Sequence, residues 1–131
     1  MSFLGPQADH AIAAFLDDGE QRGLSDKIRM IVTGEMGRTT NKGGNRGGTD
    51  HWGELTPLLI AGGGLRMGQV IGDTDRQGGR AISRRYRPEN LLTTVMHTLF
   101  DASEIRINPA LVPAEVATLM NNAAPPITEL F

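Results

Sequence analysis

Apolar residues recur at helical spacing near both ends of the chain. Near the N-terminus this pattern predicts a helix over residues 7–23, with Gly23 placed to close it. A longer apolar stripe predicts a second helix over residues 88–102, with Pro88 in its first turn. A weaker pattern predicts a short helix over residues 113–121. Both ends of the chain are therefore expected to be helical.

Continuous apolar runs between these helices predict strands. Residues 27–33 and 58–61 read as strands buried on both faces, and residues 69–71 read as a third. The order of helix, strand, loop, strand and helix predicts an α/β layered fold with some parallel strands. The C-terminal stretch 124–131 is expected to be extended and to dock on the core. Its docking side chains are Ile127, Leu130 and Phe131.

The middle of the chain is rich in glycine. Of the 17 glycines, 14 fall between Gly34 and Gly79. Residues 34–54 are expected to form one long loop, because their composition suits neither a helix nor a strand. Loops of this length inside a domain are usually functional or disordered.

Four residues of this segment carry candidate chemistry. Glu35 follows the first predicted strand, where open α/β sheets place their ligands, and it can serve as a metal ligand, a base or a partner for Arg38. His51 is a candidate metal ligand with Asp50 as its orienting neighbour. The alternative is an exposed loop histidine beside Trp52 packed on the core.

Other motifs carry weaker signals. The glycines and cations of residues 37–48 can cradle an anion, but a flexible loop is the simpler interpretation. Six arginines between residues 66 and 87 favour a solvated or anion-facing surface over a nucleic-acid site, because the rest of the chain is acidic. Residues 72–79 lack the glutamate that completes a calcium loop. His97 lies in an apolar helical stripe and is expected to be packed rather than to bind a ligand.

The overall composition and net charge limit which classes of protein and partner remain possible. The 131 residues fit a single domain, 1–131, with 39% hydrophobic residues and a net charge of −2. The absence of cysteine excludes disulfides and thiolate metal sites. We expect no nucleic-acid partner and no membrane span. We also expect a cytoplasmic location for the chain as given, since its start lacks a signal peptide; a longer parent could be exported.

Several blocks of the chain resemble one family. They are "AFLDDGEQRGLSDKIRMIVTGEMGRT", "GGTDHWGELTPLLIAGGGLRMGQVIGDTDRQG", "RPENLLTTVMHTLF" and "PPITELF". In this order they are similar to the C-terminal part of the domain of unknown function 1501 family. That family in turn resembles the alkaline phosphatase and sulfatase superfamily. The resemblance implies part of a doubly wound α/β sheet, with flanking helices and a long glycine-rich central loop.

The resemblance also implies site residues. Glu35 and His51 match two metal-ligand positions of the superfamily, for zinc or calcium, while Met36 stands where a third ligand is expected. Asp50 and Arg38 would support the metal or bind an anion. The nucleophile of the superfamily comes from its N-terminal half, so no catalytic residue is assigned here.

Two functions follow from the resemblance. The first is the C-terminal segment of a sulfatase-like or alkaline phosphatase-like metal-dependent hydrolase of sulfate or phosphate esters, inactive as this isolated chain. The alternative is a non-catalytic interaction module that keeps the fold. In either case an exposed sheet edge is expected to favour homo-oligomers.

Overall fold

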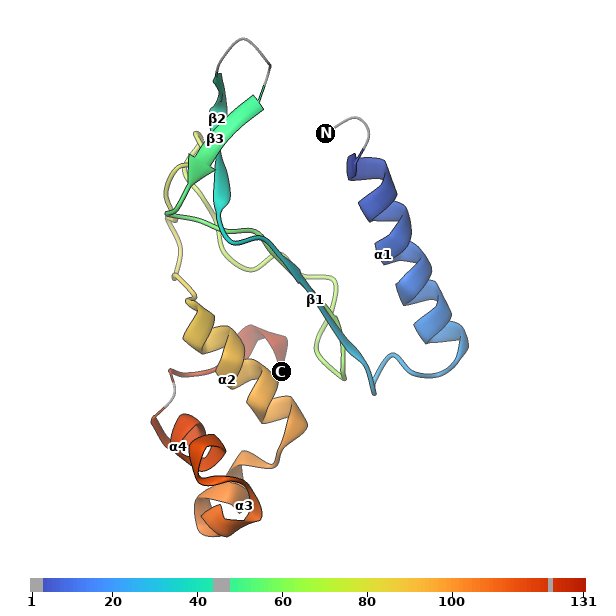
Figure 1. The fold of residues 1–131 in the computed structure, drawn as a ribbon, viewed down its shortest axis with the longest axis vertical. Coiled ribbons are helices and arrows are strands. Elements are labelled where there is room, and N and C mark those ends of the chain that lie inside the picture. The colour runs from blue at the N-terminus through green and yellow to red at the C-terminus, as the bar shows by residue number, and fades with distance from the viewer. Residues whose placement is uncertain (1–3, 44–47, 123) are drawn as a thin grey trace.

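The computed structural model describes residues 4–43, 48–122 and 124–131. A bent β-ribbon runs through the centre of the molecule, with one helix beside it and the other helices gathered at its lower end (Figure 1). The helices are α1 (Leu4–Gln21), α2 (Pro88–Leu99), α3 (Ala102–Ile107) and α4 (Ala114–Asn122), with short 3-10 turns η1 (Pro109–Leu111) and η2 (Thr128–Leu130). The strands are β1 (Arg29–Thr33), β2 (Gly37–Gly43), β3 (Gly48–Trp52) and β4 (Leu58–Gly62).

The ribbon consists of two antiparallel strand pairs in series. β1 pairs with β4 from Arg29 opposite Gly62 to Thr33 opposite Leu58. β2 pairs with β3, starting with Gly37 opposite Trp52. The chain thus runs out along β1 and β2 and returns along β3 and β4. The expectation of parallel strands is wrong for the described residues, because a direct hairpin return produces antiparallel neighbours.

The expected long loop over residues 34–54 is also wrong. Most of this segment forms the β2–β3 hairpin, and residues 44–47 lie outside the described part of the chain. Glycine weakens a strand locally, but β-branched threonines favour it, and pairing with an adjacent strand supplies the hydrogen bonds. The threonines of this hairpin are Thr39, Thr40 and Thr49.

The strands around Ile31 and Leu59 are less covered than their sequence predicted. Both side chains are exposed, as are Val32 and Leu58, so burial on both faces is wrong for β1 and β4. The reason is that this sheet has two strands in the described structure, with no third strand beside them. Residues 69–71 are irregular rather than a strand, and the chain there forms only an isolated bridge between Thr74 and Ala81.

The helices are close to their predicted places. α1 is closed by Gly23, whose φ of 63° lies in the left-handed region that glycine tolerates. The helix predicted over residues 88–102 ends at Leu99 as α2, and a separate helix that was not predicted, α3, begins at Ala102. Phe100 is extended, and the Asp101 carboxylate then accepts hydrogen bonds from the first amides of α3. None of the described helices is long and apolar enough to cross a bilayer.

Two small apolar clusters hold the lower part of the molecule together. One contains Leu65, Ile127 and Leu130, with Ile60, Ile71 and Tyr86 packed against it. The other contains Ile105, Ala117 and Met120, with Met96, Ala102, Val112 and Val116. α1 contributes no buried residue to either cluster. The first cluster therefore joins β4 to the C-terminal stretch, the second joins α2 to α3 and α4, and α1 stays outside both.

The C-terminal stretch docks as expected through two of its three apolar side chains. Ile127 and Leu130 are buried, whereas Phe131 is 47% exposed and lies edge-on to the ring of His97. The hydroxyl of fully buried Thr94 accepts a 2.8 Å hydrogen bond from the amide of Ile127. His97 is half-buried, which confirms the expected packed histidine.

Candidate functional site

The candidate residues lie in the bend between β1 and β2, which we call the kink of the β-ribbon, and in the β2–β3 hairpin. Glu35 lies in the bend between β1 and β2, and its side chain is exposed. Arg38 is in β2, and Asp50 and His51 are in β3. The segment that the sequence suggested as a loop thus carries these groups mainly on paired strands.

The kink between the strand pairs is set by one glycine. Gly37 is buried, and a Cβ atom at this position would collide with the backbone carbonyl of Leu55. The hydroxyl of Thr33 also donates a 3.1 Å hydrogen bond to the carbonyl of Pro57. This bond joins the end of β1 to the residue before β4, next to the kink. The bend that carries Glu35 is therefore held by close backbone contact.

Arg38 and His51 are directly opposite each other in the β2–β3 ladder. Residues that face each other across an antiparallel pair share one face, with Cβ atoms about 4.5–5.5 Å apart. The guanidinium of Arg38 donates to the carbonyl of Thr49 at 3.4 Å. The ladder thus brings a cation and an imidazole together on one face of the hairpin.

The alternative in which Glu35 pairs with Arg38 is not formed in the described part of the chain. Among the described residues the ion pairs are Arg22 with Asp18 and Arg85 with Glu54. The same part of the chain has no group of three or more histidine, aspartate or glutamate side chains arranged to hold a metal. The shared metal site of Glu35 and His51 stays a prediction.

Asp50 stands beside His51 in β3. Its backbone amide donates to the hydroxyl of Thr39 at 3.0 Å, which fixes the strand rather than the imidazole. Successive side chains in a strand point to opposite faces. The carboxylate of Asp50 and the imidazole of His51 therefore lie on opposite faces of β3, and the expected orienting contact is not formed between these two described residues.

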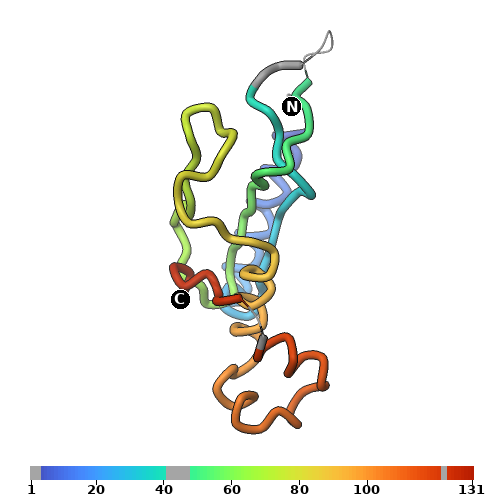
Figure 2. Tube along the Cα trace, turned by 90° about the vertical axis from the view of Figure 1, so that its left-hand side faces the viewer, coloured from blue at the N-terminus to red at the C-terminus, as the bar shows by residue number. Residues whose placement is uncertain are grey.

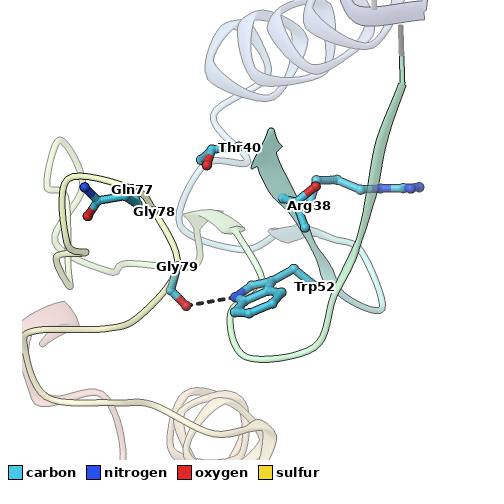
Figure 3. A pocket seen from close by; sticks show the side chains of 7 residues that line it. Arg38, Thr40, Trp52, Gln77, Gly78 and Gly79 are labelled. Carbon is cyan, nitrogen blue, oxygen red and sulfur yellow. Dashed lines mark hydrogen bonds between the residues drawn. The ribbon is translucent and has the colours of Figure 1, made fainter. Parts of the chain in front are cut away.

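A shallow pocket of about 150 Å³ lies on the hairpin beside Trp52. Figure 3 shows the Trp52 ring turned toward Gly79, while the Arg38 side chain extends away from Gln77. The indole Nε1 donates a 2.8 Å hydrogen bond to the carbonyl of Gly79. The lining residues are Arg38, Thr39, Thr40, Trp52, Gln77, Gly78 and Gly79.

The loop that closes this pocket is shaped by Asp75. Its carboxylate accepts a 2.7 Å hydrogen bond from the amide of Gly79, and its amide donates to the carbonyl of Arg80 at 3.0 Å. Figure 2 shows the following segment, in yellow, running back toward the helices. In the sequence this loop resembles only an incomplete calcium motif. An aspartate followed within a few residues by glycines, as Asp75 is followed by Gly78 and Gly79, is a signal for a turn closed by the aspartate side chain. This signal would have predicted the hydrogen bond from the amide of Gly79 to the carboxylate of Asp75.

The arginine-rich segment contacts the C-terminal stretch through several hydrogen bonds, one of which joins two side chains. The hydroxyl of Tyr86 lies 2.6 Å from both carboxylate oxygens of Glu129, and the guanidinium of Arg84 lies over the Tyr86 ring at 5.2 Å. Burial and the hydrogen bond to Glu129 raise the pKa of Tyr86. The same hydrogen bond lowers the pKa of Glu129. The six arginines are all exposed, which fits the solvated surface that the sequence favours.

Comparison with known families gives one match. A family model described as "Protein of unknown function (DUF1501)" matches residues 1–106, so the chain belongs to that family. The comparisons with curated proteins and with solved structures gave no match. The family assignment made from the sequence blocks is confirmed, and the further placement among sulfatase-like proteins stays a prediction.

Proposed function

We propose that this member of the family supplies the metal- and anion-binding β-ribbon of a sulfatase-like or alkaline phosphatase-like hydrolase of sulfate or phosphate esters. In this proposal the ribbon belongs to the C-terminal part of a doubly wound hydrolase domain and has no turnover by itself. The observation that carries the proposal is the cross-strand placement of Arg38 opposite His51. A cation next to a ligating imidazole suits an anionic ester beside a metal ion.

The donor set fits a divalent metal in part. A carboxylate from Glu35 and an imidazole from His51 are ordinary zinc ligands, and both side chains are exposed and accessible. Zinc or calcium bound there would polarise an ester oxygen. A catalytic zinc usually has three protein ligands, so two leave the set incomplete.

The roles of the chain's own residues follow from their positions. Glu35 and His51 would hold the ion, and Arg38 would attract and orient the sulfate or phosphate group. Attack on the ester needs a nucleophile placed beside the metal, and no residue of this chain is assigned that role.

The experiment measures zinc binding by calorimetry and turnover of chromogenic sulfate and phosphate esters with zinc, calcium or magnesium. We expect weak zinc binding that is lost in His51→Ala and Glu35→Ala, and no turnover. His10→Ala is the matched control, because His10 is an exposed histidine in α1, outside the ribbon. Zinc binding that survives in His51→Ala would contradict the site. Turnover that disappears in His51→Ala would make the chain an enzyme by itself.

A non-catalytic interaction module is the second candidate function. The observation that favours it is the exposed apolar surface of the β1–β4 pair, which includes Ile31 and Leu59. Exposed apolar surface of this kind marks interaction sites. A chain that binds a partner but shows no zinc binding would favour this candidate over the first.

A further inference from the structure

The chain between β4 and α2 is held at two places. Residues 63–87, all of which the structure describes, contain no helix or strand, and we call them the crossing segment. Within it, the loop over residues 73–83 reaches the β2–β3 hairpin, where Trp52 donates to the carbonyl of Gly79. The parts of the crossing segment before and after this loop contact the C-terminal stretch, residues 124–131, which is drawn in red in Figure 2.

Glu129 of the C-terminal stretch joins the two sides of that loop. Its backbone carbonyl accepts a 2.8 Å hydrogen bond from the side-chain amide of Gln69, which precedes the loop. Its carboxylate oxygens lie 2.6 Å from the hydroxyl of Tyr86, which follows the loop. A single residue near the end of the chain therefore holds both sides of the loop that covers Trp52.

Leu130 adds backbone and apolar contacts at the same place. Its carbonyl accepts a 2.8 Å hydrogen bond from the amide of Arg66, and its side chain is buried in a cluster with Leu65. Ile71 and Tyr86 pack against this cluster from opposite sides of the loop. Because apolar burial is favourable, the side chain of Leu130 stabilises both sides of the loop together.

The crossing segment has little other apolar support. Its side chains outside the cluster are largely in solvent, since Met67, Val70 and Ile82 are 41%, 96% and 67% exposed. Irregular segments with few buried apolar contacts open locally at low free-energy cost. The contacts with the C-terminal stretch are therefore the main apolar support of this segment.

We propose that the C-terminal stretch controls access to the pocket beside Trp52. When the stretch is docked, Glu129 and Leu130 hold the two sides of the loop together, and the carbonyl of Gly79 stays on the indole. When the stretch undocks, the loop leaves Trp52, and the pocket opens beside Arg38, which lines it. Docking and closure are thus coupled, and by thermodynamic linkage the coupling acts in both directions. The coupling does not involve the proposed metal ligands.

The fluorescence of Trp52 tests the coupling, because Trp52 is the only tryptophan of the chain. Leu130→Ala should undock the C-terminal stretch and uncover the indole, so that acrylamide quenches the fluorescence more strongly than in the natural chain. Met120→Ala is the matched control, since Met120 is 5% exposed against 4% for Leu130 but lies in the other apolar cluster. Its quenching should equal that of the natural chain. Equal quenching in both variants would mean that general loss of stability uncovers Trp52, and would overturn the proposal.

Amide hydrogen exchange follows both ends of the coupling in the same sample. In Leu130→Ala the amides of Ile127 and Gly79 should both exchange at least about tenfold faster, because exchange follows the equilibrium for local opening. The amide of Ile105 in α3 should exchange at its natural rate, since it lies in the other cluster. Fast exchange at Ile127 with unchanged exchange at Gly79 and unchanged quenching would show that the stretch undocks without opening the loop. That result would overturn the proposal.

A second variant avoids the apolar cluster. Glu129→Ala removes an exposed side chain and its contact with Tyr86, and it should produce the same effects at smaller size. The reverse direction is tested by Trp52→Phe, which should speed exchange of the Ile127 amide, as linkage requires. Unchanged exchange at Ile127 in Leu130→Ala and Glu129→Ala would show that these contacts do not hold the stretch, and it would also overturn the proposal.

Discussion

The indole of Trp52 in β3 is hydrogen-bonded to the carbonyl of Gly79, 27 residues later in the chain, at 2.8 Å. This bond joins the β-hairpin to the loop that Asp75 shapes. The hairpin has two strands, so contacts from outside the sheet matter more to it than to a strand in a larger sheet. The loop over Trp52 is thus part of what keeps Arg38 and His51 in register.

Replacing Trp52 with phenylalanine tests this contact. Trp52→Phe keeps an aromatic ring but removes the indole donor, and we expect the free energy of unfolding to fall by about 1 kcal/mol. Amide hydrogen exchange over residues 73–81 should become faster. Urea unfolding followed by circular dichroism and exchange measured by mass spectrometry check both effects. Unchanged exchange in this loop would show that the hydrogen bond does not hold it.

The hydroxyl of Thr94 gives a second prediction. It accepts from the amide of Ile127 and donates to the carbonyl of Asn90, and it is fully buried. Thr94→Val preserves the shape but leaves the Ile127 amide without its acceptor, at a cost of about 1–3 kcal/mol. Thr94→Ser is the matched variant, because it keeps the hydroxyl. Exchange of the Ile127 amide should be fast in the valine variant and slow in the serine variant; equal rates would contradict this role.

The contact between Tyr86 and Glu129 predicts a pH dependence for docking of the C-terminal stretch. The lowered pKa of Glu129 means that its contribution is present above its usual pKa of about 4.3 and is lost as pH falls through the folded value. The raised pKa of Tyr86 means that its contribution is present below about pH 10 and is lost as pH rises through the folded value. Docking should therefore be strongest between these limits. Exchange of the amides of residues 127–131 measures it across the pH range.

Tyr86→Phe is the control for this pH dependence. It keeps the ring that packs on the Leu65 cluster and removes the phenol that contacts Glu129. Both the alkaline loss and the Glu129-dependent part of the acid loss should disappear. An unchanged profile in Tyr86→Phe would assign the pH dependence to other groups.

The helices were predictable because their signals are local. Gly23 closes α1 through its own backbone conformation, and the apolar stripe that contains Met96 marks α2. The hairpin was missed because the glycines between Gly34 and Gly53 outweighed the threonines in the sequence interpretation. Whether such a segment pairs depends on its partner strand, and single-residue preference does not contain that information.

The candidate site was predictable as a set of residues but not as a geometry. The sequence selects Glu35 because it follows a predicted strand and His51 because Asp50 precedes it, and the family resemblance adds both as metal-ligand positions. The antiparallel ribbon instead places Arg38 opposite His51, and a cross-strand register cannot be read before the strands are known. The contact between Trp52 and Gly79 was missed for the same reason, because the sequence does not show which distant carbonyl an indole reaches.

The last prediction concerns the kink at Gly37. A Cβ atom there would collide with the carbonyl of Leu55, and this group is backbone, which cannot move aside as the end of a flexible side chain can. We expect Gly37→Ala to lower the free energy of unfolding by about 1–3 kcal/mol, as overpacking of a buried position does. Gly53→Ala is the matched control in the same segment, because a Cβ there meets no atom within 4 Å. Since it also restricts the unfolded chain, Gly53→Ala should be neutral or stabilise by about 0.4–1 kcal/mol.

The same two variants connect the kink to the proposed metal site. If Glu35 and His51 share an ion, the bend between β1 and β2 sets how far the carboxylate lies from the imidazole. Gly37→Ala should then weaken zinc binding at a temperature where the variant is still folded, and Gly53→Ala should leave it unchanged. Calorimetric titration of both variants beside the natural chain measures this. The contradicting result is equal zinc affinity in all three proteins, together with the expected loss of stability in Gly37→Ala. The kink would then stabilise the β-ribbon without affecting metal binding, and Glu35 would not bind the ion together with His51.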